Sequence, residues 1–498
     1  MKTEFVIKKM DISSGGPVVS YLNLDDCTRL GLHRGSRIVL KYGRKRVFAV
    51  VDTVISTVKS GIVGLNKEAI DALGITRNND VVVAMSFETP KSLDYIKEKM
   101  DGKSLSKDKL FNIVKDIVDN RLGEAEIAFF ISASYMRSMS LKENVWLTEA
   151  MVETGDVLKH KAKIVADKHC IGGVAGNRTT MLIVPILAAA GVIIAKTSSR
   201  SITSPAGTAD TVEVLGNVNL SLDKIKRVVS KTNGCMVWGG ALNLAPADDK
   251  IIRIEHKISV DPVSQLLASV LAKKKSVSAT HVLIDIPVGK GAKVSSRKDA
   301  YMLKEKFERI GKALGMKIMV IITDGSEPVG NGIGPALEAK DVLYILKNDS
   351  RLPKDLKKKG LFMSSLLLEF VGKAKKGQGL KMATEILESG KAFEKFKEIL
   401  SFQGLITADP EKIVPGRFSA SIKAGKSGKI SAINNSVISD IAKTAGNPLD
   451  KSAGIYLHCH KGQKINKNDV IYDIYAETRD KLSFALKIAK ENSAYVIQ

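Results

Sequence analysis

The segment 167–180 combines residue types that bind phosphate groups. Its glycines Gly172, Gly173 and Gly176 allow the backbone to approach a ligand closely. The segment lies between a predicted strand and a predicted helix, so its amides meet the positive end of a helix dipole. It lacks the Gly-x4-Gly-Lys-Ser/Thr spacing of a P-loop, and a tight strand-to-helix turn would need the same glycines. A phosphate cradle and a purely structural turn both remain open here.

A second predicted strand-to-helix connection, 196–210, is rich in hydroxyl side chains and contains Arg200. Hydroxyls both donate and accept hydrogen bonds, as a sugar requires, and a guanidinium binds phosphate in bidentate fashion. A polar surface loop that ends in a threonine cap would have the same composition. Open α/β sheets bind ligands where neighbouring strands end. The two connections together therefore predict a sugar-phosphate site more strongly than either does alone.

A third segment, 261–273, begins with Asp261 before a proline, which is the pattern of a helix N-cap. Asp261, Gln265, Ser269 and Lys273 are spaced four apart, so they form one polar stripe on an otherwise apolar helix. A cap and a catalytic acid both remain open for Asp261, and one carboxylate can serve both roles. Lys293 follows a strand predicted over 281–287 and could reach the same sheet edge, although such a lysine is more often solvated.

The composition describes a globular chain of several domains. With 498 residues, 44% hydrophobic and 26% charged, the chain is too long for one compact domain and is neither disordered nor fibrous. The longest apolar run, 181–195, is interrupted by Pro185 and Gly191 and is short for a membrane span. The first ten residues lack the apolar stretch of a secretory signal. We therefore expect a soluble, cytoplasmic protein with no membrane partner.

The net charge of +24 attracts either polyanions or small phosphorylated substrates. Aromatic residues make up only 5% of the chain, so stacking platforms for nucleic acid are scarce and a nucleic-acid partner is not expected. The four cysteines form no Cys-x-x-Cys pair, which argues against a disulfide framework or a structural zinc site. Adjacent residues of a strand point to opposite faces, so 458–460 (His-Cys-His) cannot converge on one metal.

The hydrophobic periodicity predicts an α/β fold: a mainly parallel sheet domain, a helical-bundle domain and an extra β-rich N-terminal domain. Strands expected over 163–166 and 192–195 each lead into one of the two polar connections. The predicted domains are a β-rich domain at 1–86, a helical domain at 87–158 completed by 243–275, an α/β phosphate- and sugar-binding domain at 159–242 and 276–425, and a β-rich appendage at 426–498.

Several motifs together resemble those of the thymidine/pyrimidine-nucleoside phosphorylase family. They are Leu-Thr-Glu-Ala-Met-Val-Glu-Thr-Gly at 147–155, the Lys-His…Gly-Gly loop at 168–173, and Ser-Ser-Arg at 198–200 with Gly-Thr-Ala-Asp-Thr-Val-Glu at 207–213. Within the family the chain is most similar to the archaeal AMP phosphorylases. The N-terminal β domain and the segments 238–241 and 245–249 are features associated with that branch.

This resemblance implies phosphorolysis of AMP to adenine and ribose 1,5-bisphosphate, without a metal or cofactor, by a homodimer or larger homo-oligomer built through the helical domain. CMP and UMP are further candidate substrates. Asp261 would be the proton donor to the leaving base. The substrate-binding positions carried over are Gly173, Ser199, Arg200, Ser201, Ile202, Thr203, Ser204, Thr208, Ser269 and Lys293, together with Lys168 and Lys273.

Two positions depart from the family pattern. Cys170 stands where a serine is usual, which removes one hydroxyl donor for phosphate, and Ile254 stands where the pyrimidine enzymes have an arginine for the base. Ile254 therefore disfavours a thymidine-type site. The alternatives are a pyrimidine nucleoside phosphorylase, an anthranilate-phosphoribosyltransferase-like enzyme with a Mg-pyrophosphate site, and a non-catalytic nucleic-acid binder.

Overall fold

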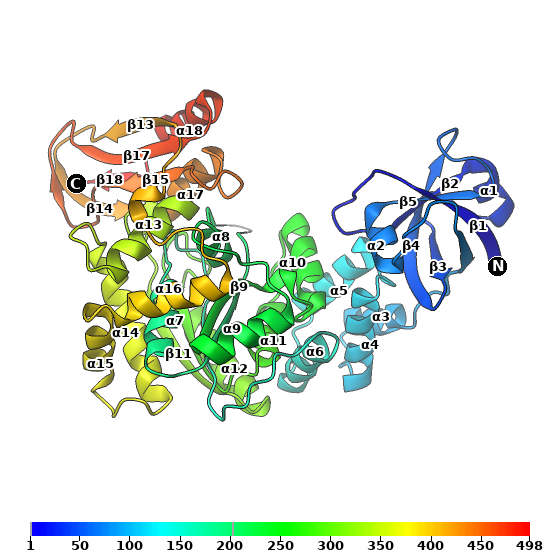
Figure 1. Cartoon of the computed structure of the whole chain (residues 1–498), viewed down its shortest axis with the longest axis horizontal. Helices are drawn as coiled ribbons and strands as arrows, with labels where there is room; N and C mark the ends of the chain where they lie inside the picture. Colours follow the sequence, from blue (N-terminus) through cyan, green and yellow to red (C-terminus); the bar gives the residue numbers. More distant parts are fainter. Residues whose placement is uncertain (1, 202–203) are drawn as a thin grey trace. The chain divides into compact units, whose positions relative to one another are not determined.

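The computed structural model describes residues 2–201 and 204–498, and the chain divides into two compact units (Figure 1). Unit 1 consists of Met1–Thr154 and Pro246–Ala268, and unit 2 consists of Gly155–Ala245 and Ser269–Gln498. The chain leaves unit 1, forms part of unit 2, returns to unit 1 and then completes unit 2. Each unit is therefore assembled from segments that are distant in the sequence.

Unit 1 begins with a closed β-barrel, which is blue in Figure 1. Alternate residues of its strands point inward, so Phe5 and Ile7, like Ile38 and Leu40, are buried in the barrel core. In spatial order the strands are β1 (Lys2–Lys9), β5 (Ile62–Leu65), β2 (Val19–Asn23), β4 (Lys45–Val54), β3 (Arg37–Tyr42) and β6 (Val81–Ser86). The β-rich N-terminal domain is confirmed, although the short strands β2 and β5 were not predicted.

The remainder of unit 1 is mainly helical, as predicted. Lys250 donates from Nζ to the carbonyl oxygens of Ile117 and Val118, at 2.8 and 2.6 Å, where a helix 132 residues earlier ends. Because terminal carbonyls have no partner within their own helix, this lysine ties the returning segment to the bundle. Burial lowers the pKa of Lys250 to about 8. The helices of this unit are α1 (Leu24–Leu30), α2 (Lys67–Leu73), α3 (Ser92–Met100), α4 (Lys107–Val118), α5 (Glu124–Met136), α6 (Leu141–Glu153) and α10 (Pro246–Ile258).

Unit 2 contains the predicted parallel sheet. A parallel bridge between Val165 and Ile193 joins its two parts into the order β11-β10-β7-β8-β9, and all neighbouring strands run parallel. Their carboxyl ends therefore meet at one edge. The strands are β7 (Ala166–Cys170), β8 (Ile194–Ser198), β9 (Gly234–Trp238), β10 (His281–Val288) and β11 (Lys317–Asp324).

The extents predicted for the first two of these strands are wrong. The strands were expected over 163–166 and 192–195, but β7 continues through Asp167, Lys168 and His169, and β8 continues through Lys196. Polar residues next to glycines or hydroxyls are typical of a loop. Here Asp167, Lys168 and Lys196 are buried within strands, and Asp167 pairs with Lys196 across the sheet.

Helices cover the sheet, and α7 (Thr180–Ala189) is buried along nearly its whole length, as expected for a helix that is apolar all round. The other helices that include residues of unit 2 are α8 (Thr208–Glu213), α9 (Leu222–Thr232), η1 (Gly239–Ala241), α11 (Val263–Ser276), α12 (Arg297–Ala313), α13 (Pro335–Leu346), α14 (Lys354–Phe370), α15 (Gly379–Glu388), α16 (Lys391–Gln403) and η2 (Pro410–Lys412).

The last part of unit 2 forms a second β-rich module, orange to red in Figure 1. A strand from the α/β region, β12 (Gly332–Ile333), pairs with β15 of the module and so joins the two parts. The module consists of β13 (Phe418–Lys423), β14 (Gly428–Ile433), α17 (Asn435–Thr444), β15 (Gly454–Leu457), β16 (Lys464–Ile465), β17 (Val470–Ala476), α18 (Arg479–Glu491) and β18 (Tyr495–Ile497).

Within residues 2–201 and 204–498, no helix has both the length and the apolar character that a membrane crossing requires. The cytoplasmic location expected from the sequence stays a prediction.

Candidate functional site

Buried charged side chains gather in the parallel sheet and the helices beside it. We call them the sheet-edge cluster, which consists of the buried Lys168, Lys196, Lys274, Asp167 and Asp285 together with Lys359, whose side chain is 12% exposed. On one face of the sheet, Asp167 accepts a hydrogen bond from Lys274 Nζ at 2.7 Å, and its other oxygen lies 3.6 Å from Lys196 Nζ. Lys196 Nζ also donates to the carbonyl oxygen of Lys168 at 2.8 Å.

On the other face of the sheet, Lys168 Nζ donates to Thr179 Oγ1 at 2.9 Å, directly before α7 begins. Asp285, whose pairing partner in the sheet is Cys170, accepts from Thr323 Oγ1 at 2.6 Å and lies 3.5 Å from Lys359 Nζ. Lys168 has no carboxylate within ion-pair distance among the described residues. It is a buried cation whose hydrogen-bond partner is a neutral hydroxyl.

The sheet-edge cluster contains four lysines and only two aspartates. Burial lowers the pKa of Lys168, and burial lowers that of Lys196 well below its ordinary value. Burial and the neighbouring lysines also keep the pKa of His169 well below its usual range, so this imidazole adds no positive charge at neutral pH. A buried excess of cations is unfavourable unless an anion compensates for it. The cluster is therefore suited to binding an anion such as phosphate.

The glycine-rich connection after β7 requires its glycines for packing. Gly173 and Gly176 have φ angles of +87° and +71°, in the left-handed region that favours glycine. A Cβ atom on Gly173 would lie 2.3 Å from the backbone nitrogen of Lys293, and one on Gly176 would lie 2.2 Å from the carbonyl oxygen of Val329. The structure thus brings Gly173 and Lys293, both predicted site residues, into contact. The side chain of Lys293 is exposed.

Cys170, which replaces the family serine, accepts a hydrogen bond on Sγ from the amide of Asn177 at 3.4 Å. Burial raises the pKa of the Cys170 thiol above its ordinary value, so the group is neutral at neutral pH. A neutral thiol is a weak hydrogen-bond donor. Within this connection, Thr179 is the hydroxyl that lies against Lys168. Sequence reasoning did not select Thr179, although it lies within the polar segment that was singled out.

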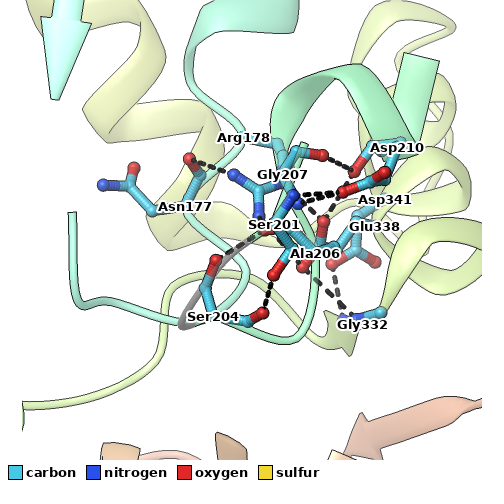
Figure 2. A network of polar contacts seen from close by, with 12 residues as sticks. Asn177, Arg178, Ser201, Ser204, Ala206, Gly207, Asp210, Gly332, Glu338 and Asp341 are labelled. Carbon is cyan, nitrogen blue, oxygen red and sulfur yellow. Dashed lines mark hydrogen bonds and ion pairs between the residues drawn. The ribbon is translucent and has the colours of Figure 1, made fainter. Parts of the chain in front are cut away.

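The hydroxyl-rich connection after β8 is held by the carboxylate of Asp210. One oxygen of Asp210 accepts from the backbone amides of Ser201 and Gly207, at 2.7 and 2.8 Å (Figure 2). Ser201 Oγ donates to the carbonyl oxygen of Ser204, and Ser204 Oγ donates to that of Ala206 at 2.9 Å. The connection is therefore tied to the first turn of α8. Of the predicted site residues here, Ser199 is exposed and Thr208 half-buried, while Ile202 and Thr203 lie outside the described residues.

Arg200 has carboxylate partners within the protein. Its guanidinium nitrogens donate to the two oxygens of Glu213 at 2.6 and 2.7 Å and to Asp210 at 3.2 Å, and it lies 4.7 Å from the ring centre of Trp238. Arg200 holds the pKa of Glu213 at about 2, with a further contribution from Lys451. The guanidinium of Arg200 therefore makes its bidentate contact with the carboxylate of Glu213, whereas such a contact had been expected with phosphate. A substrate contact by Arg200 stays a prediction.

Two hydroxyls at the end of β8 have unmet hydrogen-bonding capacity. Thr197 Oγ1 and Ser198 Oγ are buried, and neither has a hydrogen-bond partner within the described part of the chain. Leaving a buried polar group unpaired costs about 1–3 kcal/mol, so such a pair of hydroxyls indicates a polar ligand. Both belong to the hydroxyl-rich segment noted in the sequence, but sequence reasoning assigned substrate contacts only from Ser199 onward.

The helix α11 carries the remaining predicted residues. Asp261 precedes the helix, belongs to unit 1 and is exposed, whereas Ser269 and Lys273 belong to unit 2 and are half-buried. The fully buried lysine of this helix is Lys274, not Lys273. From the four-residue spacing, Lys273 was the lysine expected to face the site. Successive helical residues point about 100° apart around the axis, so Lys274 points in a different direction from Lys273. The tertiary packing decides which of the two is buried. Gln265, also in the stripe, is buried, and its amide atoms have no hydrogen-bond partner among the described residues.

This architecture matches family models along most of the chain. Residues 93–155 match the helical bundle domain of the glycosyl transferase family, and residues 162–393 match its a/b domain. Residues 429–496 match the pyrimidine nucleoside phosphorylase C-terminal domain. The fold is also that of anthranilate phosphoribosyltransferase from Thermus thermophilus, with a TM-score of 0.51 and 18% identity over 62% of this chain and 99% of that one. The fold and site thus define a glycosyl transferase with a helical bundle and an α/β domain.

Curated relatives match nearly the full length. AMP phosphorylase 1 of Archaeoglobus fulgidus is 44% identical over 96% of this chain and 94% of its own. AMP phosphorylase of Pyrococcus furiosus is 43% identical over 97% and 96%, respectively. A putative thymidine phosphorylase of Legionella pneumophila (strain Corby) is 41% identical over 99% and 95%. The chain belongs to this glycosyl transferase family, in the part that holds the AMP and thymidine phosphorylases.

Proposed function

We propose that this protein is an AMP phosphorylase, which converts AMP and phosphate into adenine and ribose 1,5-bisphosphate. The observation that carries the proposal is the excess of buried cations in the sheet-edge cluster, beside the unpartnered hydroxyls of Thr197 and Ser198. Support for AMP as the substrate comes from relatives of that name that are 40–44% identical over almost the whole chain.

In this proposal the residues of unit 2 bind the attacking phosphate. Lys168 and Thr179 supply a buried charge and a hydroxyl that are already hydrogen-bonded to each other, and Thr197 and Ser198 supply two further hydroxyls. A phosphate oxygen forms the new bond to C1′ of the ribose while the C1′–N bond breaks. Fixed charges in a site with little water stabilise the developing charge better than water does.

The leaving base takes the electron pair of the broken C1′–N bond. Asp261 donates a proton to that nitrogen, so adenine departs as a neutral molecule. The transition state has oxocarbenium character at C1′. Ser269, Lys273 and Lys293 remain proposed substrate contacts, as do Gly173, the described serines of the hydroxyl-rich connection and Thr208.

A thymidine phosphorylase is the second candidate, because two relatives that carry the name putative thymidine phosphorylase are 41% and 40% identical over 99% of the chain. Ile254, which is buried in α10, argues against it, since an aliphatic side chain offers the base none of the hydrogen bonds that an arginine would. CMP and UMP remain candidate substrates beside AMP.

The deciding experiment compares AMP, CMP, UMP, adenosine and thymidine, each with and without phosphate, with free base measured by chromatography. We expect adenine to be released from AMP only when phosphate is present, at a rate unchanged by a metal chelator. Faster release of thymine from thymidine would replace the proposal with the second candidate. Base release without phosphate, or none from any substrate, would contradict phosphorolysis of either kind. An anthranilate-phosphoribosyltransferase-like enzyme would instead depend on Mg²⁺ and yield no free base.

We further propose that the protein is a homodimer or larger homo-oligomer that associates through α5. From Ile127 onward this helix is mostly apolar, yet Phe129, Tyr135 and Met136 are 53%, 61% and 77% exposed. A helix of that composition needs a cover, and a second copy of the helical domain would supply one. We expect Phe129→Asp to shift the sedimentation coefficient toward the monomer, while Phe484→Asp, an equally exposed position on α18, leaves it unchanged. A monomeric wild-type protein would contradict this assembly.

A further inference from the structure

A buried arginine connects the two polar connections of unit 2. Arg178 immediately precedes Thr179, and its Nε donates to Glu338 Oε2 on α13 at 2.5 Å (Figure 2). A second guanidinium nitrogen donates to the carbonyl oxygen of Ala206, at the end of the hydroxyl-rich connection, and lies 3.5 Å from the other oxygen of Glu338. One side chain therefore fixes the distance between the hydroxyl of Thr179 and the segment that leads into Thr208.

Glu338 is fully buried, and its carboxylate accepts hydrogen bonds from three parts of the chain. Besides Arg178, it accepts from Thr211 Oγ1 of α8 at 2.8 Å and from the backbone amide of Gly334, before α13, at 3.3 Å. The starts of α7, α8 and α13 thus meet at one carboxylate. Because a buried carboxylate needs a compensating charge, Arg178 and Glu338 depend on each other.

We propose that Arg178 and Glu338 are positioning residues for the phosphorolysis reaction, and this inference rests on the proposed function. Arg178 donates its hydrogen bonds to Glu338 and to backbone carbonyls. It therefore acts through its neighbours and is not a catalytic residue. The pair holds 204–208 against the end of the glycine-rich connection. Without the pair, part of the free energy of phosphate binding would be needed to order this segment, and phosphate would bind more weakly.

The rest of the connection has an anchor of its own, which limits the damage when the pair is removed. Asp210 accepts from the amides of Ser201 and Gly207, and neither bond involves Arg178. Loss of Arg178 therefore releases the Ala206 carbonyl and leaves the first turn of α8 in place. We expect a folded variant with a displaced segment, not an unfolded protein.

The kinetic test uses the full-length protein and four variants: Arg178→Met, Arg178→Lys, Glu338→Gln and, as a control, Arg309→Met, which removes an exposed arginine of α12. We expect Arg178→Met to raise KM for phosphate by about tenfold or more. Arg178→Lys should recover part of that loss, because lysine keeps the charge beside Glu338 but cannot also reach Ala206. The double variant Arg178→Met/Glu338→Gln should be no worse than the worse single variant. The inference would be overturned if Arg178→Met kept the wild-type KM and kcat, or if the losses of the two single variants added up in the double variant.

A second measurement does not depend on turnover. Hydrogen–deuterium exchange of the peptide 204–211 should become faster in Arg178→Met and Glu338→Gln than in the wild type and in Arg309→Met. Unchanged exchange in both variants would overturn the positioning role even if activity fell. Conversely, a wild-type protein that does not cleave AMP, together with faster exchange in the variants, would reject the proposed function and retain the structural role of the pair. If Arg178→Met does not fold, the nearly isosteric Glu338→Gln carries both measurements.

Discussion

We expect replacement of Asp261 by asparagine to lower kcat for AMP phosphorolysis by about 10²- to 10⁴-fold, the range that general acid catalysis supplies. An asparagine amide has nearly the size of the carboxyl group but cannot transfer a proton to the leaving base. The substitution also keeps the length and branching of the side chain, so the backbone before α11, which begins at Val263, should stay in place. Steady-state kinetics with AMP and phosphate measure the effect.

Two controls distinguish proton donation by Asp261 from a purely structural role. Asp223→Asn changes an exposed aspartate of α9 and should leave kcat unchanged. A ribose 5-phosphate that carries 4-nitrophenol in place of adenine has a leaving group that departs without protonation, so Asp261→Asn should lose far less activity toward that compound. Normal turnover of AMP by Asp261→Asn would contradict proton donation by Asp261.

We expect replacement of Lys168 by methionine to raise KM for phosphate by about 10- to 100-fold, which corresponds to the loss of one hydrogen bond to a charged group, worth about 1.5–3 kcal/mol. Lys168 is buried, and Thr179 is its hydrogen-bond partner at 2.9 Å, so an incoming phosphate would find a charge without a carboxylate beside it. Lys226→Met, which removes an exposed lysine of α9, is the matched control. An unchanged phosphate dependence in Lys168→Met would place the phosphate elsewhere.

The same lysine predicts how stability changes with pH. Burial lowers the pKa of Lys168, whereas in the unfolded chain it returns to about 10.4. Between these two values Lys168 binds more protons in the unfolded state, so its contribution to the free energy of unfolding rises as the pH rises through that window. Lys196, whose pKa is also lowered by burial, contributes in the same direction.

Urea denaturation at several pH values, without phosphate, measures this slope. Lys168→Met should show a smaller slope than the wild type and equal or greater stability at neutral pH, because an uncompensated buried charge has been removed. Added phosphate should flatten the slope of the wild type, since a bound anion favours the charged lysine. A slope in Lys168→Met equal to that of the wild type would contradict the buried cationic cluster.

Much of the architecture could be predicted from the sequence, because it depends on local signals. Strands alternating with helices define the parallel sheet, and α13 (Pro335–Leu346) begins at a proline in the first helical position, which is a local start signal. The glycines of 172–176 and the hydroxyls of 197–208 lie in or beside the strand-to-helix connections, where they were expected. These features are visible in short windows of sequence, whatever the rest of the chain does.

The partners of the charged side chains depended on the tertiary structure. From the sequence, Arg200 was expected to bind phosphate. In the structure, Glu213 at the end of α8 accepts hydrogen bonds from the Arg200 guanidinium. Lys274, and not Lys273, is the buried lysine of α11 because the sheet covers that side of the helix. Arg178 and Glu338 are 160 residues apart, so no local pattern could pair them.

By itself, the sequence determined the order of strands and helices and the residue types at the two polar connections, since helix and strand periods and glycine conformations are properties of neighbouring residues. The tertiary structure alone decided which charges are buried, which are neutralised and which are left in excess. Electrostatic compensation acts through space over a few ångströms, and the fold brings together groups as distant in the sequence as Asp167 and Lys274 or Arg178 and Glu338, which are 107 and 160 residues apart.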